Sequence, residues 1–168
     1  MNLTTFTTNY QLEETDAIVL KKSFLGMVDH YVIYMGKREN RPIFIANFQD
    51  GIKEIPYYEI QKYLNKYQPE RIERFQGSYE ERAIAFKRAV SRIGEKAYNY
   101  VSNNCEHFKN WVHYGENYSK QVNAVGNGAI VTGLTVGTIG LAKKNKTTAI
   151  VGASIIILGG ILKKLSNN

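Results

Sequence analysis

Two stretches near the carboxyl end contain no charged residue, and they limit most strongly what this chain can fold into. They comprise residues 124–142 and 147–162, and the lysine-rich residues 143–146 separate them. As helices with a rise of ~1.5 Å per residue they would reach ~28 Å and ~24 Å, against ~30 Å for the hydrocarbon core of a bilayer. Both contain many glycines, and Gly133-to-Gly137 is a spacing that lets membrane helices approach closely. We therefore predict a glycine-rich tail of two membrane-associating helices over residues 123–168.

The alternative for this tail is a buried helical hairpin of a soluble protein. The residues before it are sufficient for a folded domain of their own, which favours the membrane. The formal net charge is +7, and an excess of this kind usually binds nucleic acid or anionic lipid. The basic residues are scattered, and several flank the apolar stretches, so we expect membrane lipid as a partner and no nucleic acid.

The single cysteine, Cys105, excludes an internal disulfide. A chain without disulfides is typical of a reducing compartment. The first residues are polar and no apolar run follows them, so no signal peptide is expected. These features together predict a domain at the cytosolic face of a membrane.

Apolar and β-branched segments between residues 17 and 55 predict three or four short strands, most simply an antiparallel meander. Residues 57–67 have a mixed, helix-compatible pattern. Residues 1–14 are polar, and we expect them to be loose, although Phe6 and Tyr10 could pack.

A clear helix is predicted after residue 78. Ser78 and Glu81 have the spacing of a capping box. Its apolar face is predicted from residues that recur at intervals of three and four, namely Tyr79, Ala83, Phe86, Val90 and Ile93. The expected fold class is α+β, with a small antiparallel sheet packed against helices and a carboxy-terminal apolar helical tail.

His30 and Asn47 are the polar residues of interest in the predicted strands. His30 lies at the entrance of one strand, and Asn47 interrupts the apolar run of the next. If Met35 pairs with Pro42 or its neighbour, His30 and Asn47 are opposite or diagonal to each other, where side chains can touch. The alternative for Asn47 is an ordinary polar group at a strand end.

Cys105 lies where another helix is predicted to begin. Asn103 can cap this helix, and Glu106 can complete a capping box. The unpaired N–H groups and the dipole of a first turn favour a thiolate, so Cys105 is a candidate nucleophile. The alternative is that Cys105 is a small, buried apolar residue.

Of the other two histidines, His107 is predicted to be structural and His113 to be a surface or packing residue. His107 is about 200° around the helix from Cys105, given ~3.6 residues per turn, and His113 is two turns away. A zinc site from Cys105, His107 and His30 is conceivable, but no metal-ligand spacing supports it. We expect neither a metal nor another cofactor.

The segment Asn104-Cys105-Glu106-His107-Phe108, followed by Tyr114-Gly115, resembles the signature of the lecithin:retinol acyltransferase family. That family includes small phospholipase/acyltransferase proteins and is related to cell-wall peptidases of the NlpC type and to papain-like enzymes. Residues 16–19 and 29–36 resemble its opening strand and its histidine-bearing strand. The resemblance covers roughly residues 12–122.

The resemblance implies a catalytic domain over residues 15–122 with a circularly permuted papain-like arrangement. It also implies that Cys105 is the nucleophile and His30 its general base. Family members usually carry a second histidine on the following strand, but this chain has Ala46 and Asn47 there. Asn47 is therefore the candidate for orienting His30, as asparagine does in papain-like sites.

Three functions follow as hypotheses. The first is a membrane-associated cysteine acyltransferase or hydrolase that acts on phospholipid or another acyl lipid through a thioester on Cys105. The second is a thiol amidase or peptidase of the NlpC type. The third is a non-catalytic module that binds lipid or remodels membranes.

Overall fold

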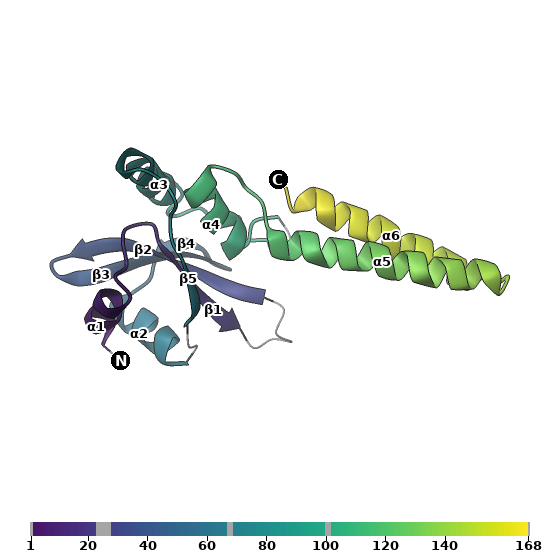
Figure 1. Ribbon diagram of the computed structural model, residues 1–168, viewed down its shortest axis with the longest axis horizontal. Coiled ribbons are helices and arrows are strands. Elements are labelled where there is room, and N and C mark those ends of the chain that lie inside the picture. The colour runs from purple at the N-terminus through teal and green to yellow at the C-terminus, as the bar shows by residue number, and fades with distance from the viewer. Residues whose placement is uncertain (1, 23–27, 67–68, 100–101, 168) are drawn as a thin grey trace. The chain divides into compact units, whose positions relative to one another are not determined.

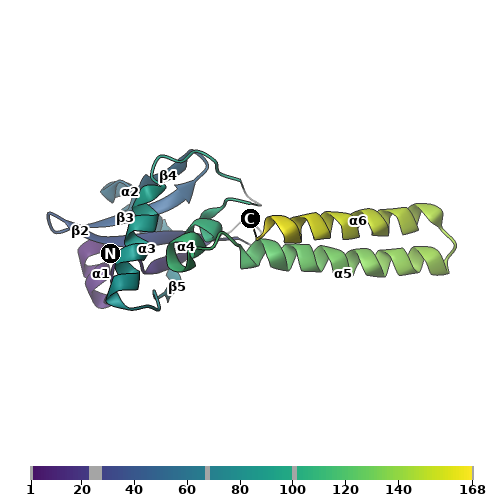
Figure 2. The ribbon, with the colours of Figure 1, turned by 90° about the horizontal axis from the view of Figure 1, so that it is seen from above.

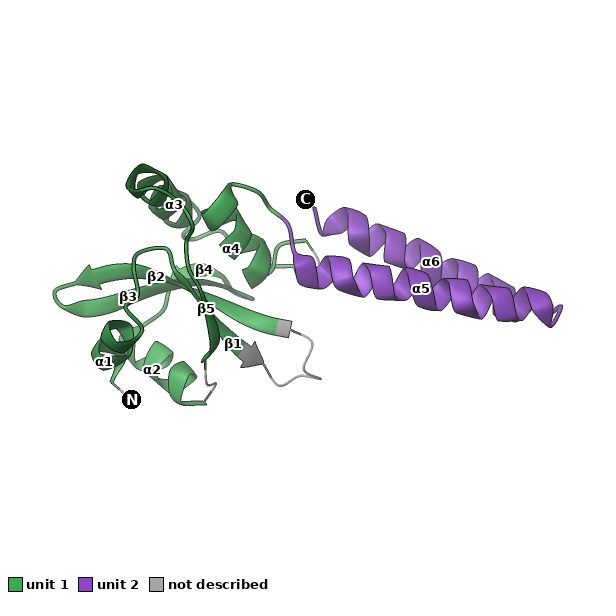
Figure 3. Cartoon of the chain, viewed as in Figure 1, with its two compact units in different colours: residues 1–117 green, residues 118–168 purple. Residues whose placement is uncertain are grey.

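The computed structural model describes residues 2–22, 28–66, 69–99 and 102–167. It divides the chain into two compact units, residues 1–117 and 118–168 (Figure 3). Within these described ranges, the first unit contains a sheet and four helices, and the second contains two helices. The α+β fold class is confirmed, with the two apolar helices at the carboxyl end.

In the part of the chain that the structure describes, the sheet has five antiparallel strands in the order β4-β3-β2-β1-β5. Their bounds are β1 Ala17–Lys22, β2 Val28–Arg38, β3 Arg41–Phe48, β4 Gly51–Glu54 and β5 Pro69–Glu73 (Figure 1). The first four strands form the predicted meander. The fifth, beside β1, was not predicted, because its sequence Pro-Glu-Arg-Ile-Glu lacks the apolar run of a buried strand.

Helices cover both faces of this sheet. The helices of the first unit are α1 Leu3–Asn9, α2 Tyr57–Lys66, α3 Tyr79–Ser91 and α4 Cys105–Tyr114. Side chains of α1 and α2 pack on the face formed by Leu20, Val32, Tyr34 and Ala46. Side chains of α3 and α4 pack on the other face, with Ile33, Met35, Ile45 and Ile52. Figure 1 shows the two pairs of helices on opposite sides of the sheet.

Two predictions about the helices were wrong. The segment expected to be loose contains α1, Leu3–Asn9, which is capped by Asn2 and buries Leu3 and Phe6 in the core. The predicted apolar face of α3 is wrong except for Phe86, which packs against the core. Tyr79 is 83% exposed, and the buried residues of this helix are Ala85 and Ala89. Small alanines allow α3 to lie close to the sheet, which a search for large apolar residues does not detect.

A buried carboxylate connects the start of β1 to the segment after β5. The side chain of Asp16 is 1% exposed and accepts a hydrogen bond from Arg74 at 2.7 Å. Its two oxygens also accept the backbone N–H groups of Phe75 and Glu13, both at 3.1 Å. Arg82 of α3 lies 3.5 Å from the same carboxylate. Asp16 therefore joins segments that are distant in sequence.

We predict that Asp16→Asn lowers the free energy of unfolding of the full chain by about 2–3 kcal/mol, because charge-assisted hydrogen bonds to a buried group are lost. Chemical denaturation followed by tryptophan fluorescence measures this change. The control is Asp50→Asn, since Asp50 forms an exposed pair with Lys53 and its loss should leave the unfolding midpoint almost unchanged. Equal effects of the two substitutions would contradict the prediction.

The second unit is an antiparallel hairpin of α5, Lys120–Ala142, and α6, Lys146–Leu165 (Figure 2). The predicted boundary at residue 123 falls inside α5, because Ser119 caps this helix. Small or polar residues recur every seven positions on each helix and meet across the hairpin. The facing pairs are Ser119 with Ser166, Gly126 with Gly159, and Gly133 with Gly152.

The contact in this seam is between backbones. A Cβ added at Gly133 would lie 2.7 Å from the carbonyl oxygen of Gly152, and one at Gly159 would lie 2.7 Å from that of Gly126. The close approach predicted for the glycines is confirmed. Both helices are long and apolar enough to cross a membrane by length and composition.

We predict that Gly159→Leu opens the hairpin, because the new side chain has no space in the seam and overpacking costs about 1–3 kcal/mol. Gly160→Leu is the matched control, since a Cβ at the adjacent Gly160 meets nothing within 4 Å. In a Cys105→Ser background, spin labels at Lys120 and Asn167 report the distance between the helix ends in detergent micelles. This distance should stay short and narrowly distributed in the control and become long and broad in Gly159→Leu. A narrow distribution in both variants would disprove the role of the seam.

Candidate active site

The site is built around the first residue of α4, which is Cys105. Asn104 is the N-cap, and its side-chain oxygen accepts the backbone N–H groups of Glu106 at 2.9 Å and His107 at 3.1 Å. The His107 ring completes the capping box by accepting the N–H of Asn104. Cys105 therefore lies in the first turn, as predicted, at the end of the helix where the dipole favours negative charge.

The predicted cap was one residue too early. The side chain of Asn103 instead donates to the carbonyl oxygen of Ala97 at 2.8 Å and to the carboxylate of Glu95 at 3.1 Å. Its oxygen accepts from Arg92 at 3.2 Å. These bonds fix the loop ahead of the helix and leave the capping position to Asn104.

The Cys105 side chain is buried against the sheet face that carries α4. It is 3% exposed and packs with Ala17, Val19 and Tyr31. Its Sγ lies 3.4 Å from the carbonyl oxygen of Asp29, to which the thiol donates. The sulfur is therefore beside the peptide bond that joins Asp29 to His30.

The His30 side chain extends from the other face of β2. Side chains alternate along a strand, so His30 points away from the face of Tyr31 and Cys105. Its ring centroid lies 5.3 Å from that of Phe48 and 6.1 Å from that of Tyr63 in α2. His30 is nearly buried, at 6% exposed.

Asn47 lies on the Cys105 face at the end of β3. Its side-chain nitrogen donates to the carbonyl oxygen of Asn103 at 3.0 Å and of Asn104 at 3.3 Å. In the β2–β3 ladder Ile33 pairs with Ile45, and continuing this register places His30 opposite Phe48. His30 and Asn47 are thus diagonal neighbours, but on different faces of the sheet.

A cavity of about 410 Å³ lies where β2 begins and β3 ends. Residues from both faces of the sheet border it: His30, Asn47, Phe48, Gln49, Asp50, Tyr63 and Tyr98. Tyr63 of α2 and Tyr98 of the segment before α4 complete the lining beside the two strands. Among the described residues, Cys105 is not part of this lining.

The structure thus brings the three predicted residues to the same end of the sheet. Asn47 contacts the backbone immediately before Cys105, and the sulfur contacts the backbone immediately before His30. The imidazole and the sulfur are separated by the thickness of β2.

Comparison with known protein families gives a match to the model of lecithin retinol acyltransferase over residues 11–118. The match spans more than half of the chain and includes the whole site. The chain belongs to the lecithin retinol acyltransferase family. No curated protein matches the chain significantly.

In this member of the lecithin retinol acyltransferase family, an ionic network that the sequence did not reveal extends from α4 to the start of β2. Lys109, one turn after Cys105, is buried and pairs with Glu73 of β5 at 2.8 Å. Glu73 also pairs with Arg71 at 2.9 Å, and Arg71 donates to the Tyr31 hydroxyl at 3.3 Å. A lysine on the buried side of a predicted helix was the available signal.

This network sets the ionisation of its members. Burial, with the nearby Glu106 carboxylate, raises the pKa of Tyr31 well above its ordinary value, so its hydroxyl stays neutral. Burial opposes ionisation of Glu73 as well, but the hydrogen bond from Lys109 and the charge of Arg71 lower its pKa overall. A neutral tyrosine and a set of paired charges therefore lie on the cysteine face of the sheet.

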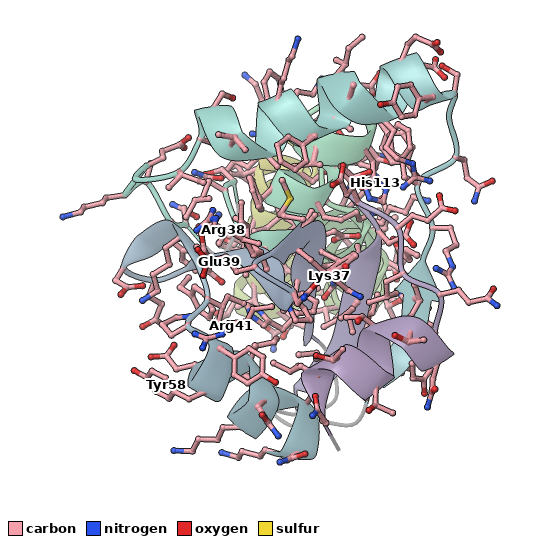
Figure 4. All side chains as sticks on the ribbon, turned by 90° about the vertical axis from the view of Figure 1, so that its left-hand side faces the viewer. Lys37, Arg38, Glu39, Arg41, Tyr58 and His113 are labelled. Atoms are coloured by element: carbon pink, nitrogen blue, oxygen red, sulfur yellow. The ribbon has the colours of Figure 1, made fainter. Side chains whose placement is uncertain are left out.

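The remaining histidines have structural contacts. His107 is fully buried and caps α4. The His113 ring lies inside the domain (Figure 4), with Nε2 2.8 Å from the carbonyl oxygen of Thr15. Across the described residues, no group of three or more His, Cys, Asp or Glu side chains is placed to hold a metal ion.

His113 makes stability depend on pH. Burial lowers its pKa to about 4, whereas an unfolded histidine titrates near 6.5. The unfolded chain therefore binds more protons between these values, and the free energy of unfolding should fall by about 3 kcal/mol as the pH falls from about 7 to about 4.

Denaturation midpoints measured across this range, in the native chain and in His113→Asn, test this prediction. The variant is expected to lose part of the dependence because an asparagine side chain does not titrate. An identical pH dependence in both proteins would exclude His113 as its source.

Proposed function

We propose that this protein is a membrane-associated cysteine acyltransferase or hydrolase that acts on lipid acyl esters through a thioester on Cys105. The family suggests activity of the acyltransferase or phospholipase type. The observation that carries the proposal is the position of the family's cysteine in this chain, as the first residue of the capped helix α4. A thiol at this position has the first-turn N–H groups and the helix dipole beside it.

In the proposed reaction His30 takes the thiol proton, and the sulfur attacks the carbonyl carbon of the ester. The carbon–oxygen bond to the lipid alcohol breaks, and the imidazolium returns the proton to the departing oxygen. Water or an amine then attacks the thioester, gives its proton to His30, and releases the sulfur. The N–H of Cys105 is the candidate donor to the negative carbonyl oxygen of each intermediate.

This proposal requires the His30 imidazole and the Cys105 sulfur to come within hydrogen-bonding distance. Catalytic hydrogen bonds often tighten only when substrate binds. The cavity gives a route, because His30 and Asn47 border it from different faces. The sulfur is already beside the peptide bond that joins Asp29 to His30. Because the His30 ring leaves β2 on the other face, the required movement includes a turn of the backbone at the start of β2 as well as of the two side chains.

Asn47 has a further part in the proposal. The amide nitrogen holds the carbonyl groups of residues 103 and 104, which fixes the loop that carries Cys105. The amide oxygen is then the group that would orient His30 once the ring turns into the cavity.

The substrate class follows from the tail. The two apolar helices weakly suggest membrane association, which would bring the domain to lipid esters. We infer that the catalytic domain works in the reducing, cytosolic compartment, where the thiol remains available.

We predict that the full chain releases labelled fatty acid, or forms a labelled N-acyl amine, from phospholipid vesicles. Cys105→Ser should reduce this activity by about a thousandfold or more, because the nucleophile is lost. The exposed residue Lys87 of α3 supplies a control, since Lys87→Ala should retain the rate. Chromatography of the labelled lipids measures both.

Two results would reject the proposed reaction. Cleavage of labelled peptide amides without cleavage of lipid esters would favour the thiol amidase. Binding to vesicles without any Cys105-dependent turnover would favour a lipid-binding or membrane-remodelling module.

A further inference from the structure

In the hairpin of α5 and α6 the smallest residues are buried and large apolar side chains are exposed. This is the opposite of the burial pattern of a water-soluble protein. Within α5 the buried residues are Val122 and three glycines, and within α6 they are two glycines. The large apolar side chains point outward. Among the most exposed are Val131, Leu134 and Leu141 on α5, and Ile150, Ile157 and Leu158 on α6, each between 52% and 71% exposed.

These side chains surround the outer half of the hairpin rather than forming one stripe. On α5, Val131, Leu134 and Ile139 are spread over roughly 140° of the circumference, given ~3.6 residues per turn. A helix that lies in the plane of a membrane surface needs one strongly polar face. The outer half of α5 lacks such a face, so lying on the surface would leave apolar side chains in water.

Three hydroxyl side chains of the hairpin have partners within their own helix. The hydroxyl groups of Thr135 and Thr138 donate to the carbonyl oxygens of Val131 and Thr135, and Ser154 donates to that of Ile150, all within 3.0 Å. In hydrocarbon, where water cannot replace a lost hydrogen bond, polar groups must be satisfied in this way.

Charge is concentrated at the two ends of the hairpin. Residues 118–168 contain six lysines and no acidic residue, so they carry +6 of the net +7 of the chain. Lys120, Lys163 and Lys164 lie at the end where the hairpin joins the domain, and residues 143–146 carry the others at the turn. Helices of 23 and 20 residues are about 34 Å and 30 Å long, which matches the hydrocarbon thickness of ~30 Å.

We propose that residues 118–168 cross an anionic bilayer twice, as a closed hairpin, so that the domain and the carboxyl end lie on the same side. The inference builds on the membrane association proposed above and specifies its form. The glycine seam holds the two helices together through their backbones, the apolar surface contacts lipid, and the lysines at both ends contact phosphate head groups. Tight packing through small residues is how helices associate when lipid is the solvent.

The topology can be tested with single cysteines in the full chain. In a Cys105→Ser background, Thr147→Cys places a thiol at the turn and Asn167→Cys places one at the other end; both sites are exposed in the protein. Each protein is reconstituted into sealed vesicles of phosphatidylcholine and phosphatidylglycerol, and vesicles with the domain outside are selected by an amino-terminal affinity tag. A membrane-impermeant maleimide is then added before or after detergent.

The proposal predicts that the Asn167→Cys thiol reacts in intact vesicles, whereas the Thr147→Cys thiol reacts only after detergent. Reaction of both thiols from outside would show that the hairpin lies on the surface, and protection of both would show a single crossing. Either result would overturn the proposal while leaving membrane association intact. Failure of the protein to enter vesicles at all would overturn membrane association as well.

A matched pair of lysine substitutions independently tests how deeply α5 enters the bilayer. Val131 is at the middle of α5 and Leu141 is near the turn, and both are exposed by more than 60%. Val131→Lys should reduce the fraction of protein inserted by about a hundredfold, because a charge at the bilayer centre is costly, while Leu141→Lys should have little effect. Equal effects would contradict a crossing.

The preference of the hairpin for anionic lipid is measured by partitioning of the native chain into vesicles with and without phosphatidylglycerol. Each lysine near an anionic surface should contribute about fivefold at physiological salt. Lys163→Gln with Lys164→Gln should therefore remove about 25-fold of the preference. Partitioning that is indifferent to the lipid charge would refute this part of the proposal.

Discussion

The position of Cys105 depends on the two hydrogen bonds that the Asn104 side chain accepts from the first turn of α4. They determine that the helix begins at the cysteine and not one residue earlier. Asn103 and Asn47 fix the preceding loop through separate hydrogen bonds. Three asparagines therefore position the backbone at Cys105. Because backbone groups at a helix start are otherwise unpaired, such capping both stabilises the fold and places the thiol in a field that favours negative charge.

The two units of the chain bury opposite kinds of residue. The domain buries large apolar side chains between helices on both faces of its sheet, and it carries charged networks such as that of Asp16 around this core. The hairpin buries glycine and exposes isoleucine, leucine and valine. The first arrangement is stable in water, and the second is suited to a solvent that is itself apolar.

Sequence patterns predicted the features that depend on local chemistry. The β1–β4 meander, the Ser78 capping box, the first-turn cysteine and the pair of apolar helices each have a short-range signal and were confirmed. Features set by tertiary packing were missed. The helix α1 is short and rich in threonine, and its helical conformation depends on burying Leu3 and Phe6 in the core.

The candidate site likewise combines residues that local sequence signals predicted with contacts that depend on tertiary structure. Residue types and spacing singled out Cys105, His30 and Asn47, and the structure gathers them at one end of the sheet. Strand register, which decides the face on which each side chain lies, was left undetermined by the sequence. The network of Lys109, Glu73 and Arg71 joins three elements, so it could not be inferred before the order of the strands was known.

The central claim is a covalent acyl group on Cys105. It is tested most directly by mixing the full chain with phospholipid vesicles, quenching in acid within the first turnover, and measuring the intact mass and the modified peptide. We expect a mass increase of one fatty acyl chain, located on Cys105 and removed by hydroxylamine. Release of fatty acid with no adduct on Cys105, or an adduct on another residue, would contradict it.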